Sequence, residues 1–206
     1  MITSLKNIFG SKCSAINING IPDIEVPLPD KPVKLCESVY RSFSEPVCIT
    51  NETVGCPGAR RSLGFDKADR ALAEIINENN GIPIPFIRDA LQFIPKLEGI
   101  KRINLGLTDY FATRLKPDLY IVYALPAKVT ALMHFLAKNN IKPTIRPFSL
   151  LSVCGNVFSN TLKNQAVSIS FGCPESRKSG GVEENEVVIG MPAKVVKLVT
   201  ENFSLF

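Results

Sequence analysis

The sequence contains a single histidine, His134, and this scarcity limits the catalytic constellations that the chain can carry. A Ser–His–Asp triad would have to use His134, and no nucleophile-elbow motif is present to supply its serine. Because His134 stands between Met133 and Phe135 in a helix-like run, we interpret it as a packed helix residue and not as a catalyst. Gly180-Gly181 is no phosphate loop, since both the Walker lysine and the GxGxxG spacing are missing.

Long apolar runs and dense basic runs are also missing. No apolar run approaches the roughly 20 residues that a bilayer-spanning helix needs. Residues 1–23 show no charged region followed by an apolar one, so we expect no signal peptide and a cytoplasmic protein without a membrane partner. The net charge of +5 is spread along the chain without interleaved aromatics. We therefore expect no nucleic-acid partner, which leaves a small molecule or an electron-transfer protein as the partner classes.

The pattern along the 206 residues predicts one domain of α/β (or α+β) class, with helices packed on a mixed sheet. Four prolines in residues 20–32 indicate an extended connection. Apolar runs and alternation predict strands at residues 14–19, 47–50, 101–107, 118–125, 149–154, 166–171 and 186–190. Helical spacing predicts a short helix from Cys36 and helices over residues 66–79, 87–94, 127–139 and 192–203.

A Gly-Cys-Pro turn occurs twice, at Cys56 and at Cys173, and each copy is followed by basic residues. A second cysteine precedes each turn. Nineteen residues separate Cys36 from Cys56, and eighteen separate Cys154 from Cys173, so one gap aligns the two units. We interpret residues of roughly 36–64 and 154–181 as an internal repeat. The repeat predicts two pseudo-repeated halves that bring four thiols toward one site.

The residues around each turn predict activated thiols. Glycine before and proline after Cys56 and Cys173 suggest tight turns that open helices, where the helix dipole favours negative charge. Arg60 and Arg177 follow four residues later. We expect these surroundings to lower the pKa of both thiols, and the thiolate is the form that binds metal or attacks.

Six cysteines in a reducing compartment indicate metal or redox chemistry more than disulfides. The usual zinc spacing of two to four residues and the tighter ferredoxin runs are both absent, so the duplication is the stronger signal. Four soft sulfur ligands suit an iron–sulfur cluster, for which [4Fe–4S] is our first choice, with zinc as the alternative. A redox dithiol and purely structural cysteines remain open. The predicted metal ligands are Cys36, Cys56, Cys154 and Cys173.

Two further sets of residues carry weaker predictions. Cys13 and Cys48 have no equivalent in the repeat, and we interpret them as packed residues. The basic residues after the turns form a candidate anion site, although for any single one of them capping of a carboxylate or exposure to solvent is the more common explanation. This candidate set consists of Arg60, Arg61, Arg177 and Lys178.

These residues resemble a family of archaeal and bacterial proteins described as domain of unknown function 169, also called ArCR. The resemblance covers most of the chain. It implies that the four repeat cysteines are the family's cysteine positions, and it brings no activity with it. Glu175 departs from the pattern, because a smaller residue often follows the turn. The resemblance is carried by Cys36, the turn at Gly55–Gly58 with Leu63-Gly64, the strand after Lys116-Pro117-Asp118, Cys154, the turn at Gly172–Pro174 with Arg177, and the segment Ile189–Pro192.

Two functional hypotheses from different classes follow. The first is a redox or sulfur-handling protein that holds a cluster, with Arg60 and Arg177 offsetting the negative charge of the cluster or binding an anion beside it. The second is a metal-free binding module for a small anionic ligand, and a thiol–disulfide switch is a further variant. The reaction, and whether there is turnover, stay open at this point.

Overall fold

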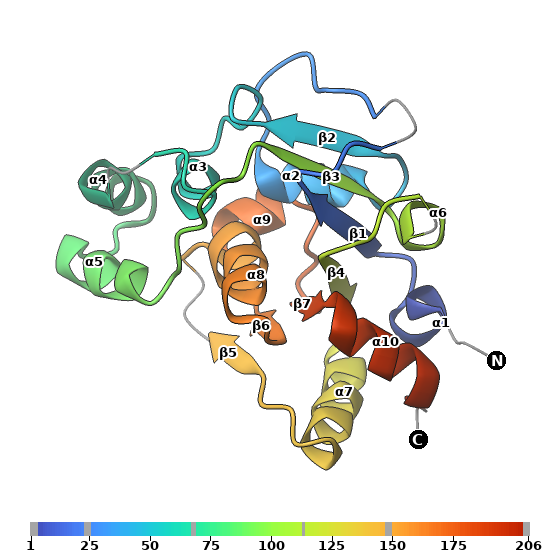
Figure 1. Cartoon of the computed structure of the whole chain (residues 1–206). Coiled ribbons are helices and arrows are strands. Elements are labelled where there is room, and N and C mark those ends of the chain that lie inside the picture. Colours follow the sequence, from blue (N-terminus) through green and yellow to red (C-terminus); the bar gives the residue numbers. More distant parts are fainter. Residues whose placement is uncertain (1–3, 23–25, 67–68, 113, 147–149, 204–206) are drawn as a thin grey trace.

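A computed structural model describes residues 4–22, 26–66, 69–112, 114–146 and 150–203. Its strands form one seven-stranded sheet in the order β2-β3-β1-β4-β7-β6-β5 (Figure 1). The pairings are antiparallel except for β5 with β6, so the predicted α/β class with a mixed sheet is confirmed. The strands are β1 (Cys13–Ile18), β2 (Val47–Thr50), β3 (Arg102–Leu107), β4 (Leu119–Ala124), β5 (Thr144–Arg146), β6 (Ser168–Ser170) and β7 (Val187–Pro192).

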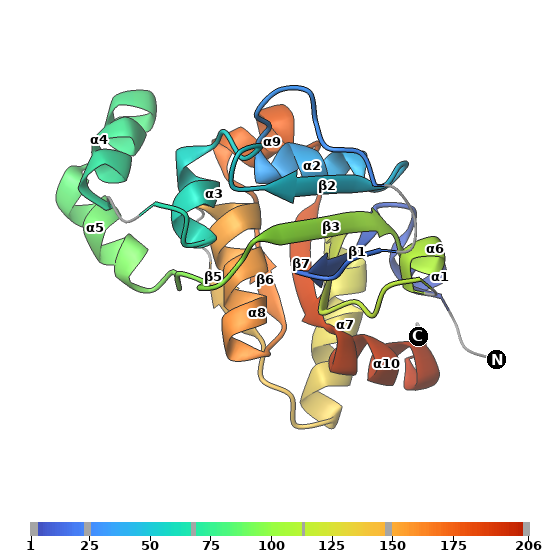
Figure 2. The ribbon, with the colours of Figure 1, turned by 45° about the horizontal axis from the view of Figure 1, so that its top comes forward.

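Helices cover both faces of this sheet (Figures 1 and 2). Residues of α2 (Leu35–Arg41), α3 (Pro57–Ser62), α4 (Asp69–Asn80), α5 (Ile84–Gln92) and the π-helix η1 (Ser152–Ser159) share one hydrophobic cluster. Residues of α1 (Leu5–Phe9), α6 (Thr108–Ala112), α7 (Pro126–Lys138) and α10 (Ala193–Asn202) share the other. The remaining helices are α8 (Asn160–Asn164) and α9 (Pro174–Ser179). Among the described residues, no helix combines the length and the apolar character needed to cross a membrane.

Strand β4 shows how the sequence encodes burial on both faces. Leu119, Ile121 and Tyr123 belong to the cluster under α2 and η1. Tyr120 and Val122 alternate with them and belong to the cluster under α7 and α10. All six residues of β4 are buried, as the continuous apolar run at 118–125 predicts.

Most other predicted elements are confirmed within one to three residues, but the strand predicted at residues 149–154 is wrong. Position 149 lies outside the described residues, and Ser152–Ser159 form the π-helix η1, in which all eight residues are buried. A short run of small and apolar residues has no clear period, so it does not distinguish a buried strand from a buried helix. The short elements α1, α6, α8 and β5 were not predicted.

The tetrapeptide Pro-Ala-Lys-Val occurs at residues 126–129 and 192–195, and it opens a helix at both positions. Pro126 is the first residue of α7, and Pro192 is the N-cap of α10. The strands that precede these helices, β4 and β7, are antiparallel neighbours in the sheet. Proline suits the start of a helix because the missing N–H has no partner there in any case. The two-halves description of the whole chain stays a prediction.

Candidate functional site

The two Gly-Cys-Pro turns begin equivalent helices. Cys56 is the N-cap of α3 and Cys173 is the N-cap of α9, and both helices have six residues that start with proline. At Cys173 the turn is closed by Ser176, whose hydroxyl accepts from the Cys173 backbone N–H at 2.8 Å and donates to the Cys173 carbonyl at 2.9 Å. Gly172 has φ +89°, a left-handed conformation that favours glycine. The predicted helix-opening turns are confirmed.

The other two cysteines lie in helices that pack against these turns. Cys36 is the second residue of α2, and Cys154 is the third residue of η1. A π-helix is rare and is found frequently at functional sites, because its wider turn displaces side chains from their α-helical positions. Figure 1 shows α2 beside α9, and η1 beside α3, on the same face of the sheet.

Two glycines permit this close packing. A Cβ atom at Gly58 would lie 2.5 Å from Leu151 Cδ2 and 3.8 Å from Cys154 Sγ, so α3 approaches η1 through a surface without a side chain. A Cβ atom at Gly180 would lie 2.8 Å from the Cβ of Cys36 and 2.7 Å from the Ser176 carbonyl oxygen. The approach of Gly58 to Cys154 and that of Gly180 to Cys36 each join a segment near residue 36 or 56 to a segment near 154 or 173. The cysteines of the two units are thus brought together across a sequence separation of at least 98 residues.

All four repeat cysteines line one small cavity of about 50 Å³, which we call the inner cavity. Its remaining walls are mainly apolar and include Leu35, Ala59, Leu151 and Val153. Cys36, Cys154 and Cys173 are buried, whereas Cys56 is partly exposed. Within the described ranges, no group of three or more His, Cys, Asp or Glu side chains is gathered closely enough to hold a metal ion. The thiols face a common space without converging on one point.

The predicted lowering of the thiol pKa is wrong for Cys56. Burial, and to a smaller extent the nearby thiols of Cys173 and Cys56, raises the pKa of Cys36 to about 12. Burial also raises the pKa of Cys56, although the backbone N–H groups of Ala59 and Gly58 act in the opposite direction. Burial raises the pKa of Cys154 well above its ordinary value. Desolvation of the thiolate outweighs the favourable turn geometry, because the cavity walls offer few compensating dipoles.

Three buried hydroxyls near this site have no hydrogen-bond partner among the described residues. They are the hydroxyls of Ser62 on α3, Tyr123 on β4 and Ser152 on η1. Tyr123 belongs to the same hydrophobic cluster as Cys36 and Cys154, and burial first, then the charge of Cys36, raises its pKa. Buried polar groups without partners are uncommon, and they indicate an unfilled acceptor position. The sequence did not indicate a role for Tyr123 at this site, because Tyr123 lies in the continuous apolar run that predicts a buried strand.

A larger cleft of about 400 Å³ adjoins the inner cavity, and we call it the outer cleft. The two spaces share Cys56 and Cys173, whereas Cys36 and Cys154 line only the inner cavity. Helix α4 forms one wall with Leu72, Ile75 and Ile76. The thiols of two cysteines are therefore within reach of a space large enough for a small molecule.

The charged residues at the outer cleft are Lys34, Glu175 and Lys178. Lys34 donates to the Glu175 carboxylate and to the Ser179 hydroxyl, the latter at 3.2 Å. This hydrogen bond from Lys34 holds the pKa of Glu175 below its usual range, and the charge of Lys178 acts in the same direction. Glu175 thus has a charged partner. Sequence reasoning missed Lys34, although it lies only two residues before Cys36.

The four predicted basic residues occupy different environments. Arg60 pairs with Asp66 at 2.8 Å and also donates to two backbone carbonyls. Arg61 is buried and donates to the carbonyls of Leu91 and Ile94. Arg177 donates to the carbonyls of Phe171 and Glu183. The three arginines thus bind protein groups, and Lys178 is the one member of the set that lines the outer cleft.

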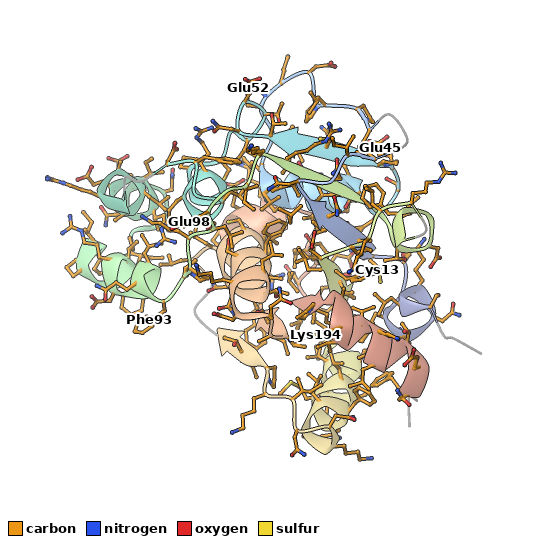
Figure 3. The ribbon with its side chains drawn as sticks, in the orientation of Figure 1. Cys13, Glu45, Glu52, Phe93, Glu98 and Lys194 are labelled. Atoms are coloured by element: carbon orange, nitrogen blue, oxygen red, sulfur yellow. The ribbon has the colours of Figure 1, made fainter. Side chains whose placement is uncertain are left out.

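Cys13, Cys48 and His134, which were not assigned to the site, line neither the inner cavity nor the outer cleft. Cys13 and Cys48 are fully buried in the cluster under α7 and α10, on the opposite face of the sheet from the inner cavity (Cys13 is labelled in Figure 3). They are packed residues, as predicted. His134 is exposed on α7, so its interpretation as a packed residue is wrong. A helix at the edge of the structure leaves one side in water whatever its mean hydropathy.

The structure is thus an α/β fold in which four cysteines line one small cavity. The sequence model of the family described as DUF169, Uncharacterised ArCR, matches residues 4–202. The chain therefore belongs to the family of domain of unknown function 169, as the resemblance suggested. No curated protein and no solved structure matches the chain.

The glycine contacts make a first prediction. Gly180→Ala should lower the free energy of unfolding by about 1–3 kcal/mol, because its Cβ meets the backbone at Ser176 and the Cβ of Cys36. Gly58→Ala is the comparison, since there the nearest atom is the mobile end of Leu151 and alanine suits a helix. Urea unfolding of both variants measures the difference. Equal stabilities would contradict the close packing of α9 against α2.

Arg61 makes a second prediction. Arg61→Met should destabilise the protein by about 2–4 kcal/mol, because two buried carbonyls lose their charged donor. Arg70→Met is the matched control, since the Arg70 side chain is 83% exposed and pairs along α4 with Glu74. We expect less than about 0.5 kcal/mol for the control. Thermal or urea unfolding checks both, and equal effects would show that Arg61 does not support the fold.

Proposed function

We propose that this protein binds an iron–sulfur cluster, [4Fe–4S], through Cys36, Cys56, Cys154 and Cys173, and that it acts in redox or sulfur chemistry. One observation supports the proposal above the others, namely that all four repeat cysteines line the inner cavity. Four separate elements contribute one thiol each, while Cys13 and Cys48 lie across the sheet. A set of sulfur ligands without histidine or carboxylate suits soft metals.

The spacing of the thiols favours a cluster over zinc. Zinc–sulfur bonds of about 2.3 Å would bring four ligating sulfurs to within about 3.8 Å of one another. The described residues contain no such gathered group. Thiols that surround a space, with two of them shared by a larger cleft, suit a polynuclear group better than one ion.

The buried hydroxyl of Tyr123 also fits a bound cluster. It has no acceptor among the described residues, and it lies close enough to Cys36 and Cys173 for their charges to raise its pKa, so a ligand or cluster sulfur would accept its hydrogen bond. Hydrogen bonds to the sulfurs and the degree of burial both set the reduction potential of such a group. The apolar walls formed by Leu35 and Val153 would limit the access of water.

The raised thiol pKa values are compatible with a metal ligand set. A thiol that is neutral in the chain alone loses its proton when it binds metal, so binding releases protons and is favoured by higher pH. When bound, an iron–sulfur cluster supplies one-electron transfer. Lys34 and Lys178 at the outer cleft add positive charge beside the thiolates. The proposal places the protein in the reducing cytoplasm, where free thiols persist.

Metal content tests the proposal directly. Protein prepared without oxygen and reconstituted with iron and sulfide should be brown and hold about four iron atoms per chain. Alanine at each of the four cysteines should reduce iron to less than about one quarter of this value, because every ligand is needed for a stable cluster. Cys13→Ala and Cys48→Ala are the controls and should retain full iron content, since both lie on the other face of the sheet.

Colourless, iron-free protein after this treatment would overturn the cluster proposal. Stoichiometric zinc in its place, lost in the same four variants, would establish the zinc alternative. Iron that survives in the four variants but not in the controls would show that the ligands are wrongly assigned.

Tyr123 makes a separate prediction for the loaded protein. Tyr123→Phe removes one hydroxyl and keeps the ring that packs against Phe43 at a centroid distance of 4.9 Å. We expect unchanged iron content and a lower reduction potential, because a hydrogen-bond donor near the sulfurs favours the reduced, more negative state. Redox titration followed by electron paramagnetic resonance measures the shift. An unchanged potential would mean that the hydroxyl does not donate to the site.

A further inference from the structure

The outer cleft has two chemically different sides. Leu72, Ile75 and Ile76 of α4 present an apolar wall, in which Ile75 is 38% exposed although its side chain is apolar. The opposite side carries the charged residues Lys34, Glu175 and Lys178. The cleft volume of about 400 Å³ lies in the range of small-molecule sites.

The charge at this cleft is positive after internal pairing. Lys34 and Glu175 form an ion pair with each other, and Ser179 accepts from Lys34 as well. Lys178 lines the cleft at its exposed edge, and its charge also stabilises the Glu175 carboxylate. Two ammonium groups and one carboxylate leave one positive charge for a ligand. One negative charge next to an apolar body is the complementary pattern.

The cleft also shares two cysteines with the proposed metal site. Cys56 and Cys173 line both spaces, and Cys56 is the one cysteine of the four that is partly exposed. A molecule in the outer cleft would therefore approach the thiols of these two residues, while Cys36 and Cys154 remain behind them.

We propose that the outer cleft binds a small amphipathic organic monoanion, with its negative group near Lys178 and its apolar part against α4. This inference deepens the proposed function and rests on it for one part only: the anion would be the molecule on which the metal site acts. Binding of the anion itself depends on the cleft and on Lys178, not on the metal.

Hexanoate is a suitable probe, because it combines one carboxylate with a short apolar chain. Hexanamide has nearly the same shape without the charge, and inorganic phosphate has charge without an apolar part. Ligand-observed NMR titrations give the dissociation constant for each compound. We expect hexanoate to bind, hexanamide to bind about threefold to fivefold more weakly, and phosphate not to compete with hexanoate.

Lys178→Gln should weaken hexanoate binding by about threefold to fivefold and leave hexanamide binding unchanged. Raised salt should reduce the difference, because the Lys178 ammonium is exposed. Lys194→Gln is the matched control, since Lys194 is an exposed lysine on α10, away from the cleft (Figure 3). It should change neither affinity.

The inference is overturned if hexanoate does not bind, if hexanamide binds equally well, or if Lys178→Gln and Lys194→Gln behave alike. Iron is measured in the same samples, so the two proposals fail separately. Hexanoate binding that depends on Lys178 in iron-free protein supports the cleft and removes the cluster. In iron-loaded protein, hexanoate should change the electron paramagnetic resonance spectrum, and an unchanged spectrum would reject the anion as the molecule on which the metal site acts.

Discussion

The candidate site depends on the close approach of helices from two distant parts of the chain. Helix α9 packs against α2 at Gly180, and α3 packs against η1 at Gly58, where even one extra carbon would collide with the neighbouring element. Protein interiors do not absorb such collisions easily, because they are packed as densely as organic crystals. A Cβ atom at Gly180 would meet the Ser176 carbonyl oxygen and the Cβ of Cys36, whereas one at Gly58 would mainly displace the mobile end of Leu151, so Gly180 is the more restrictive of the two contacts.

Burial raises the pKa values of these thiols and leaves polar groups near them without hydrogen-bond partners among the described residues. Apolar walls keep Cys36 and Cys154 neutral, and buried hydroxyls such as that of Tyr123 find no acceptor among the described residues. A purely structural core would fill such a space with hydrocarbon, which has no donors to satisfy. A bound metal–sulfur group would stabilise the thiolates through its positive metal charge and would accept a hydrogen bond from the hydroxyl through its sulfur atoms. The raised pKa values and the hydroxyl without an acceptor therefore both support the proposed function.

The proposed cluster would occupy the inner cavity, and the proposed anion would occupy the outer cleft. The inner cavity is small and is lined by all four repeat cysteines, whereas the outer cleft is larger and carries both charge and apolar surface. Cys56 and Cys173 belong to both spaces, so the helix-opening turns connect them. The α4 wall comes from an α-helical hairpin with α5 at the edge of the molecule, on the side where α3 and η1 lie (Figures 1 and 2).

The sequence by itself determined the features that depend on local pattern: the buried strand β4, the helix α7 and the turns at Cys56 and Cys173. Periodicity, proline and glycine act over a few residues, so their effects on local structure can be predicted without knowledge of the fold. Only the tertiary structure decided the sign of the thiol pKa shifts and the binding of the arginines to protein carbonyls and to Asp66. The helical state of Ser152–Ser159 was decided in the same way. Desolvation and long-range hydrogen bonds depend on what surrounds a group, and residues far away in the chain supply those surroundings.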